Sequence, residues 1–459
     1  LVPAACACWL LCPGLAGSTE ATFKGGAAAA PSAPTPAPSR GLNTLPSVPT
    51  KGHVFILNTD IRLLACDVWL LPVDRTLEID RAWNVPDCEH PSHPPPGWGS
   101  TTLVAPCCPK TPEGRRRRSQ VRYRTYEHPL PVAVDVIAAS HAPRKTVPDL
   151  IAALRQFLDV AAREADHSNF GRARPLVALP IFCAGLAADE QDQTGGSQLG
   201  EVIKAVLDEL HAFVMAHDVD VALCSIDSAA FSAALDARRK RFPDFLTRAP
   251  LLASDRDRYQ AEVLRLAHLC LAGQVSLFLG AGVSINAGLP SWSQLLDQLA
   301  LEAGFTASAR GYIHELDPLE AASVCAARLG GDRALKRCVA RIIGRAKRHS
   351  LQHALLAGVP FRGCISTNYD TLFEQAVRCA GGDIAVLPAE VGSVRDTWCL
   401  KLHGSVDRPD TIVLTRADYV RFSKEQAACE GVLQGLLLTQ HVLFCGFGMR
   451  DENCCRISS

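Results

Sequence analysis

Apolar positions in the first half of the chain follow two alternating spacings. Short runs in which every residue or every second residue is apolar predict buried strands, and stretches with apolar residues three or four apart predict helices. The predicted strands are 53–58, 66–72, 132–139, 176–182 and 219–225, and the predicted helices are 147–164 and 199–216. Strands that alternate with helices are typical of an α/β fold with a mainly parallel sheet.

The same alternation starts again near residue 255. The predicted helices are 258–272, 292–303, 318–329, 333–346 and 351–356, and the predicted strands are 275–279, 364–367, 399–402, 412–414 and 442–445. We therefore expect an α/β protein with two consecutive Rossmann-like, three-layer αβα domains and mainly parallel sheets, at 51–245 and 255–459.

Two segments break this pattern. Residues 1–50 are rich in Pro, Ala and Ser, which predicts a disordered, low-complexity leader. A trimmed signal or transit segment at 1–16 is the alternative, because this stretch is apolar and ends in small residues. Residues 75–130 are rich in Pro, Arg and Cys and predict an irregular insertion in the first domain.

Charge and composition narrow the class of protein. The 47 basic and 47 acidic side chains cancel, so no long-range field attracts nucleic acid or an anionic membrane. A hydrophobic fraction of 48% is enough for sizeable cores. We expect a cytoplasmic protein without a nucleic-acid or membrane partner, and the sequence leaves open whether it forms a homo-oligomer.

The nineteen cysteines are scattered, and no C-x-x-C pair occurs among them. Structural zinc sites and small disulfide frameworks both need regular cysteine spacing. The sequence therefore predicts free thiols in a reducing compartment and no bound zinc.

The densest motif is VSLFLGAGVSINAGLPSW at 275–292. A predicted strand runs into Gly280, Ala281 and Gly282, whose small side chains would let backbone amides approach a diphosphate in front of a helix. A G-x-G alone is weak evidence, because a tight turn also needs glycine. Ser284 and the further residues of the motif make it a candidate dinucleotide loop.

This motif resembles the opening motif of the sirtuin superfamily. Three later segments resemble that family's landmarks in the same order, namely TNYD at 367–370, KLHGS at 401–405 and FCGFG at 444–448. The resemblance implies NAD as the substrate. The binding residues that it implies are Gly280, Ala281, Gly282, Ser284, Gly288, Pro290, Trp292, Thr367, Gly446 and Gly448.

The resemblance also implies three catalytic residues. Asn368 and Asp370 would hold the nicotinamide and ribose region, and His403 would act as base on a ribose hydroxyl or on water. Cleavage of the nicotinamide to ribose bond needs positioning, a base and exclusion of stray nucleophiles, and histidine suits the base role near neutral pH. Taken singly, Asn368 or Asp370 could cap a helix and His403 could belong to a core.

The second domain differs from protein-deacylating sirtuins. Those enzymes carry a four-cysteine zinc ribbon after the His-Gly motif, whereas residues 404–428 contain no cysteine. Residues 411–419 resemble the zinc-free branch that includes NAD hydrolases of antiviral and stress-response systems. The resemblance implies hydrolysis of NAD to nicotinamide and ADP-ribose. The alternatives are an idle module that senses NAD or ADP-ribose, an NAD-dependent protein deacylase and an ADP-ribosyltransferase.

The end of the chain departs from the family pattern as well. The last family motif reads Gly-x-Ser, whereas this chain has Gly446, Phe447 and Gly448 and stops about ten residues later. We therefore expect a domain that is truncated at its C-terminus, with an edge element missing on the adenine side of the pocket.

The first domain is similar in layout to a macrodomain, an ADP-ribose-binding α/β fold. The similarity rests on residues 54–74, 177–185 and 219–227, and it implies that Asp60 contacts adenine and that 184–200 wraps a diphosphate. The asparagine pair that such hydrolases carry after the second strand is absent here. We therefore expect either a structural domain or a sensor of an ADP-ribose-like ligand.

Overall fold

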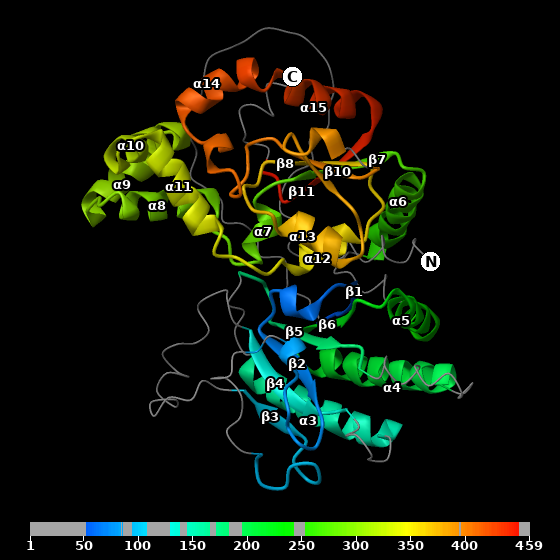
Figure 1. Ribbon diagram of the computed structural model, residues 1–459. Coiled ribbons are helices and arrows are strands. Elements are labelled where there is room, and N and C mark those ends of the chain that lie inside the picture. The colour runs from blue at the N-terminus through cyan, green and yellow to red at the C-terminus, as the bar shows by residue number, and fades with distance from the viewer. Residues whose placement is uncertain are drawn as a thin grey trace.

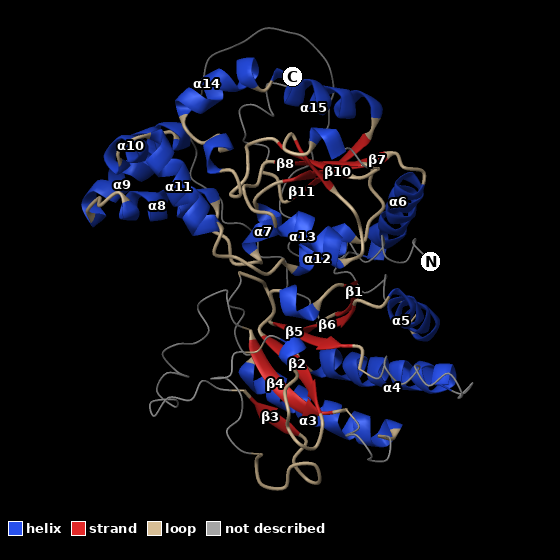
Figure 2. Ribbon diagram, in the orientation of Figure 1, coloured by secondary structure: helices blue, strands red, loops and turns tan. Residues whose placement is uncertain are grey.

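The computed structural model of the chain describes residues 52–83, 85, 94–107, 129–137, 145–165, 171–182, 195–242, 253–393 and 396–448. The expected leader, the middle of the expected insertion, residues 183–194 and the residues after 448 lie outside this part. Two sheets organise the described residues (Figures 1 and 2). None of the helices in this part is both long and apolar enough to cross a membrane.

The first sheet has six strands in the order β1-β6-β5-β2-β4-β3. The strands are β1 (Val54–Asn58), β2 (Val68–Val73), β3 (Val104–Pro106), β4 (Leu130–Asp135), β5 (Leu176–Pro180) and β6 (Asp220–Ser225). Only β3 pairs antiparallel, with β4. The five predicted strands are confirmed. Strand β3 was missed because three residues are too short for a periodic pattern.

Three helices cover one face of this sheet. They are α3 (Val147–Glu164), α4 (Gly195–Ala216) and α5 (Ser228–Arg241), and the short 3-10 turns η1 (Ile61–Leu63) and η2 (Arg81–Trp83) lie in the connections. Val54 and Ile56 of β1 share a buried cluster with these helices. Side chains alternate along a strand, so Phe55 and Leu57 point to the opposite face.

The second sheet has five strands, all parallel, in the order β11-β7-β8-β10-β9. The strands are β7 (Val275–Leu279), β8 (Gly363–Ser366), β9 (Ala385–Leu387), β10 (Trp398–Lys401) and β11 (His441–Cys445). The chain runs outward from β7 and later returns to its other side as β11. The carboxyl ends of β7 and β11 therefore flank a topological switch point, where open α/β sheets bind ligands.

Helices cover both faces of the second sheet, and four more form a lobe beside it (Figure 1). One face carries α6 (Ala253–Leu271), α12 (Leu351–Ala357) and α13 (Leu372–Cys379), and the other carries α14 (Arg416–Glu425) and α15 (Ala427–Thr439). The lobe consists of α8 (Trp292–Glu302), α9 (Ala307–Glu315), α10 (Pro318–Leu329) and α11 (Asp332–Ile343). The remaining turns are α7 (Gly282–Ile285), η6 (Val391–Ser393) and η7 (Pro409–Thr411).

The predicted strand at 412–414 is wrong. Ile412 and Leu414 are fully buried, but their segment forms no ladder. The amide of Val413 donates to the carbonyl of His403 at 3.0 Å, and the Tyr369 hydroxyl donates to the carbonyl of Val413 at 2.9 Å. A short apolar run bounded by turns has the same sequence pattern whether it is a strand or a buried loop.

The two sheets share one core, which the sequence did not predict. Phe55 and Leu57 of the first sheet belong to the same buried cluster as Leu351 and Ala354 of α12. The layers therefore run from α14 and α15 through the second sheet, α12 and α13, and the first sheet to α3, α4 and α5 (Figures 1 and 2). Within the described residues, the first sheet has helices of its own unit on one face, and its other face packs on α12, whereas the expected three-layer domain has its own helices on both faces.

Polar contacts also join the first unit (54–241) to the second unit (253–445). The side-chain amide of Asn58 donates to the carbonyl of Ala380 at 3.0 Å. Leu64 forms a parallel β-bridge with His349. Where the domain boundary lies stays a prediction, but the described contacts tie the two units together.

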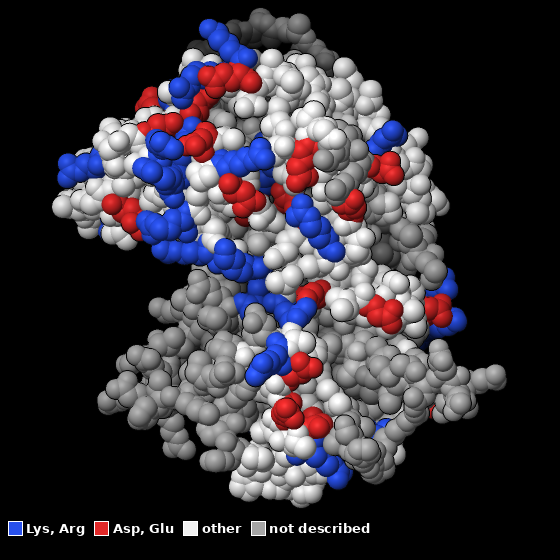
Figure 3. All heavy atoms as spheres, viewed as in Figure 1, with Lys and Arg blue, Asp and Glu red and all other residues white. Residues whose placement is uncertain are grey.

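Exposed charges are unevenly spread, although they cancel in sum. Figure 3 shows Lys and Arg gathered over the helical lobe and toward the junction of the units. Four exposed arginines recur at four-residue spacing along and just beyond α11, namely Arg333, Arg337, Arg341 and Arg345. Arg341 pairs with Glu302 at 2.7 Å. The expected absence of a nucleic-acid partner rests on the total charge and stays a prediction.

Candidate functional site

A cavity of about 580 Å³ lies at the carboxyl ends of the second sheet. Its walls come from the segments after β7, β8, β10 and β11, together with α8, the start of α10 and α14. Its volume suits a small organic molecule. The predicted site residues that line it are Ala281, Ser284, Pro290, Trp292, Thr367, Asn368, Asp370, His403, Gly446 and Gly448.

Three predicted glycines lie off this wall. Gly288 faces a neighbouring hollow lined by Gln294, Asp297 and His314. The amides of Gly280 and Gly282 donate to the carbonyls of Cys445 and Gly446 at 3.0 Å and 2.8 Å. These two amides are therefore used within the protein.

The glycines are needed because two loops touch. A Cβ on Gly280 would lie 2.5 Å from the Gly446 carbonyl oxygen, and one on Gly282 would lie 2.7 Å from the Gly446 Cα. Gly446 itself has a φ of +62° and would place a Cβ 2.4 Å from the Val283 nitrogen. The first loop thus packs backbone to backbone against the end of β11, a reason for glycine that the sequence did not reveal.

Asn368 lies directly after β8 and is 8% exposed. Its Nδ2 donates to the Gly280 carbonyl at 3.0 Å and to the Ser284 hydroxyl at 3.1 Å. Its Oδ1 is buried and accepts no hydrogen bond from the described residues. Because a buried acceptor without a donor is costly, this oxygen is suited to a ligand that brings an N–H or O–H.

Asp370 is held on both carboxylate oxygens. Its Oδ2 accepts from the Ser284 hydroxyl at 2.9 Å, and its Oδ1 accepts from the amide of Leu372 at 3.1 Å, at the start of α13. The helix-capping alternative is thus part of its role, because one oxygen serves α13. The other oxygen, Oδ2, bonds to Ser284, which lines the cavity together with Asp370.

A buried cation lies beneath the Asn368–Asp370 turn. Lys401 of β10 is 4% exposed, donates to the carbonyl of Asp370 and pairs with Glu374 at 3.3 Å. Burial alone would lower the pKa of Lys401, but the carboxylates of Glu374 and Asp370 raise it above its ordinary value. Lys401 therefore stays charged and ties β10 to the turn after β8.

His403 follows β10 and is 3% exposed. Its ring centroid lies 5.5 Å from that of Tyr419 and 6.0 Å from that of Phe422, both on α14. The next residue, Gly404, has a φ of +84°, and a Cβ there would lie 2.2 Å from the Thr411 carbonyl oxygen. Glycine therefore allows the sharp turn that leaves His403 on the cavity wall.

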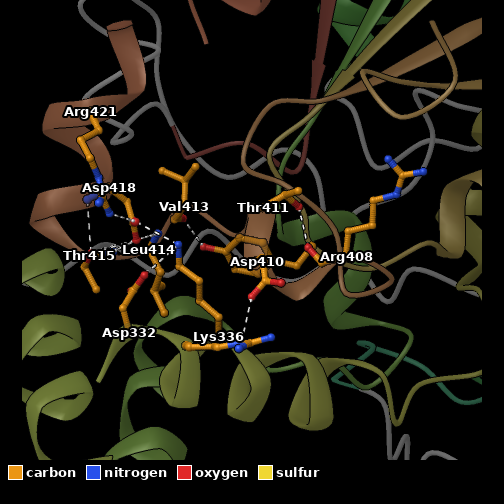
Figure 4. A network of polar contacts seen from close by, with 12 residues as sticks. Asp332, Lys336, Arg408, Asp410, Thr411, Val413, Leu414, Thr415, Asp418 and Arg421 are labelled. Atoms are coloured by element: carbon orange, nitrogen blue, oxygen red, sulfur yellow. Dashed lines mark hydrogen bonds and ion pairs between the residues drawn. The ribbon is translucent and has the colours of Figure 1, made fainter. Parts of the chain in front are cut away.

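The sequence did not single out Tyr419, which lines the cavity beside His403. Its helix is fixed by Asp418, which forms a capping box with Thr415 and an ion pair with Lys336 at 3.0 Å (Figure 4). Burial alone would raise the pKa of Asp418, but hydrogen bonds from Thr415 and Lys336 lower it. The ionised carboxylate thus anchors α14 on α11, and with it the Tyr419 side of the wall.

Asp60, the residue expected to contact adenine in the first unit, is bonded locally. Its Oδ1 accepts from the amide and from Nε of Arg62, each at 2.9 Å, where it caps η1. Most of the predicted diphosphate loop at 184–200 lies outside the described residues. The macrodomain-like ligand site stays a prediction.

No group of three or more His, Cys, Asp or Glu side chains within the described ranges is arranged to hold a metal ion. The expected absence of zinc stays a prediction.

Comparison with known proteins relates the C-terminal region to a known domain family. Residues 362–457 match the family model of the SIR2-like domain. The chain is 31% identical over 204 residues to the NAD(+) hydrolase ThsA of Enterococcus faecium, which covers 43% of this chain and 42% of that protein. It is 28% identical over 183 residues to ThsA of Bacillus cereus, covering 39% and 38%.

A further relative is Defense-associated sirtuin 2 of Bacillus subtilis, 23% identical over 187 residues, which covers 39% of this chain and 18% of that protein. The chain thus spans less than half the length of these curated relatives. Its C-terminal region contains a SIR2-like domain, and the expected resemblance to the defence-type branch is confirmed.

Proposed function

We propose that the chain, with its SIR2-like C-terminal region, hydrolyses NAD to nicotinamide and ADP-ribose. The observation that carries the proposal is the cavity at the switch point, whose wall includes Asn368, Asp370 and His403 together. Relatives over this region are named NAD(+) hydrolases, which supports the same substrate. That the whole chain has this activity is likewise our proposal, because the similarity to these relatives covers only part of it.

Asn368 would bind the nicotinamide end. Its buried Oδ1 would accept an N–H of the nicotinamide carboxamide, and its Nδ2 is already fixed by Gly280 and Ser284. A side chain held from one side presents its other atom without a further loss of rotamer freedom. The amide would therefore orient the leaving group.

Asp370 and His403 would act on the ribose side. Breaking the C–N bond leaves positive charge on the ribose, which a nearby carboxylate such as that of Asp370 would stabilise. His403 would accept a proton from the attacking water or from a ribose hydroxyl. The balanced reaction consumes one water and yields nicotinamide, ADP-ribose and one proton.

The test is nicotinamide release from NAD by the purified chain. Release at a rate proportional to protein concentration supports the proposal. Binding of NAD without release favours an idle sensing module, and release that needs an acylated peptide favours a deacylase. The control is heat-unfolded protein, which excludes spontaneous cleavage.

We also propose a reducing, cytoplasmic setting. Cys66, Cys224, Cys364 and Cys445 are buried free thiols. Burial raises the pKa of the Cys66 thiol and of the Cys445 thiol to about 12. Unpaired thiols are typical of reducing compartments. Labelling with a thiol reagent before and after unfolding, without a reductant, would test this. Free buried thiols react only after unfolding, whereas disulfides do not react in either state.

A further inference from the structure

The Ser284 hydroxyl connects two of the three candidate catalytic residues, Asn368 and Asp370, to a buried histidine. It donates to Asp370 Oδ2 at 2.9 Å and accepts from Asn368 Nδ2 at 3.1 Å. On its third side lies Nε2 of His353, 3.3 Å away. His353 is fully buried on α12 and does not line the cavity.

The contacts of the His353 ring fix its tautomer. Its Nδ1 accepts from the amide of Ser350 at 3.1 Å, so Nδ1 carries no proton. The ring proton is therefore on Nε2 and faces the Ser284 oxygen. Because Ser284 donates its own proton to Asp370, its oxygen can accept hydrogen bonds from both Asn368 and His353. Each donor among these four side chains therefore has an acceptor.

The ring is neutral under ordinary conditions. Burial lowers the pKa of His353 to about 4, with the Lys401 charge acting in the same direction and Asp370 against it. A neutral ring has one donor and one acceptor, which is what Ser284 and Ser350 require.

The turn that carries His353 is held from several sides. Ser350 caps α12, and its hydroxyl donates to the Val283 carbonyl at 2.8 Å, next to Ser284. The preceding residue, His349, exchanges backbone hydrogen bonds with Leu63 and Ala65 of the first unit, each at 2.8 Å. The donor that His353 offers to Ser284 is therefore placed by surrounding structure.

We propose that His353 is a positioning residue, which through Ser284 holds Asn368 and Asp370 in the geometry needed for NAD cleavage. This inference rests on the proposed function. The competing explanation is purely structural, since His353 is also the third residue of the capping box of α12.

Two substitutions separate the explanations. In His353→Asn the side-chain oxygen falls near the place of Nδ1 and keeps the cap, but the shorter side chain does not reach Ser284. In His353→Gln the longer side chain brings an amide N–H to the place of Nε2. We expect kcat to fall about 10²-fold in His353→Asn, with KM near that of the wild type, and to stay near wild type in His353→Gln.

A double-mutant cycle adds a sharper criterion. If His353 acts through Ser284, then Ser284→Ala and His353→Asn lower kcat by similar factors, and the double variant is no slower than Ser284→Ala. Fully multiplicative losses would overturn the proposal. The proposal would also be overturned if His353→Asn and His353→Gln lost the same factor in kcat and showed the same drop in Tm. Such a result would indicate a structural role for His353.

Amide hydrogen exchange tests the positioning without catalysis. We expect faster exchange over residues 367–372 in His353→Asn and wild-type exchange there in His353→Gln. If the wild type releases no nicotinamide, the proposed function fails. Amide hydrogen exchange over residues 367–372 then remains as the test of whether His353 positions this turn. Unchanged exchange in His353→Asn would then overturn the inference.

Discussion

The imidazole Nε2 of His349 lies 2.9 Å from the hydroxyl of Thr59, and both side chains are buried. This contact joins the first unit to the turn that precedes α12. It makes the junction of the units a polar as well as an apolar interface.

Thr59→Val removes this hydrogen bond at nearly constant volume. We expect the free energy of unfolding to fall by about 1–3 kcal/mol, because a buried imidazole nitrogen loses its partner. Denaturant unfolding measures the change. Thr101→Val, at an exposed position, serves as the matched control, and an equal loss in both variants would refute the role of the junction contact.

Acid should destabilise the protein through its buried histidines. Burial lowers the pKa of His349 to about 3 and of His353 to about 4, against about 6.5 in the unfolded chain. The unfolded state therefore binds protons first, so the stability is complete above about pH 6.5 and is lost as the pH falls toward 4 and then 3. His353→Gln should flatten the upper part of this profile, and a variant curve parallel to that of the wild type would contradict the assignment.

His403→Gln and Asn368→Ala should each abolish most NAD cleavage. Loss of a general base costs about 10²- to 10⁴-fold in rate. Glutamine is the better probe at 403, because the ring packs against Tyr419 and Phe422 and alanine would leave a void. Nicotinamide release with a melting curve for each variant checks this. Variants that keep pace with an active wild type would show that the residues are misassigned.

Gly282→Ala should disrupt the site through the backbone. A Cβ there would lie 2.7 Å from the Gly446 Cα, so the loops after β7 and β11 must separate. We expect lost NAD cleavage and a lower Tm. Gly431→Ala in α15 is the control, since a Cβ at Gly431 meets nothing within 4 Å and helical alanine is favoured by about 1 kcal/mol. If both variants behaved alike, the interlocked loops would not matter.

We expect the purified chain to hold no tightly bound zinc, because 404–428 lacks cysteine and no C-x-x-C pair occurs. Elemental analysis after dialysis measures this. One zinc per chain would reopen the deacylase alternative.

Sequence patterns predicted most of the strands and several of the helices, but not α9, α13, α14 or α15. The helix 147–164 agrees with α3 to the residue, and so does the strand 275–279 with β7. Short strands such as β9 and helices with few apolar residues such as α5 were missed, because their buried residues are too few to make a pattern. Tertiary context, which a local pattern does not contain, decides such segments.

For the candidate site, ten of the predicted residues share one cavity, and most of them follow the carboxyl ends of parallel strands. Tyr419 and His353 were not found. Tyr419 comes from a helix on the far face of the sheet, and His353 acts from behind the wall, so neither stands in a motif with strand-end spacing.

The layer shared by the two sheets determines what a backbone cut would do. Were the chain cleaved between Phe242 and Ala253, the fragments would still be held by the apolar face that carries Phe55 and Leu57 against α12. Their separation would present that face to water, where it would favour aggregation. The nicked protein should therefore behave as a non-covalent heterodimer of its own two halves. It should elute as a single species in size-exclusion chromatography until it is denatured.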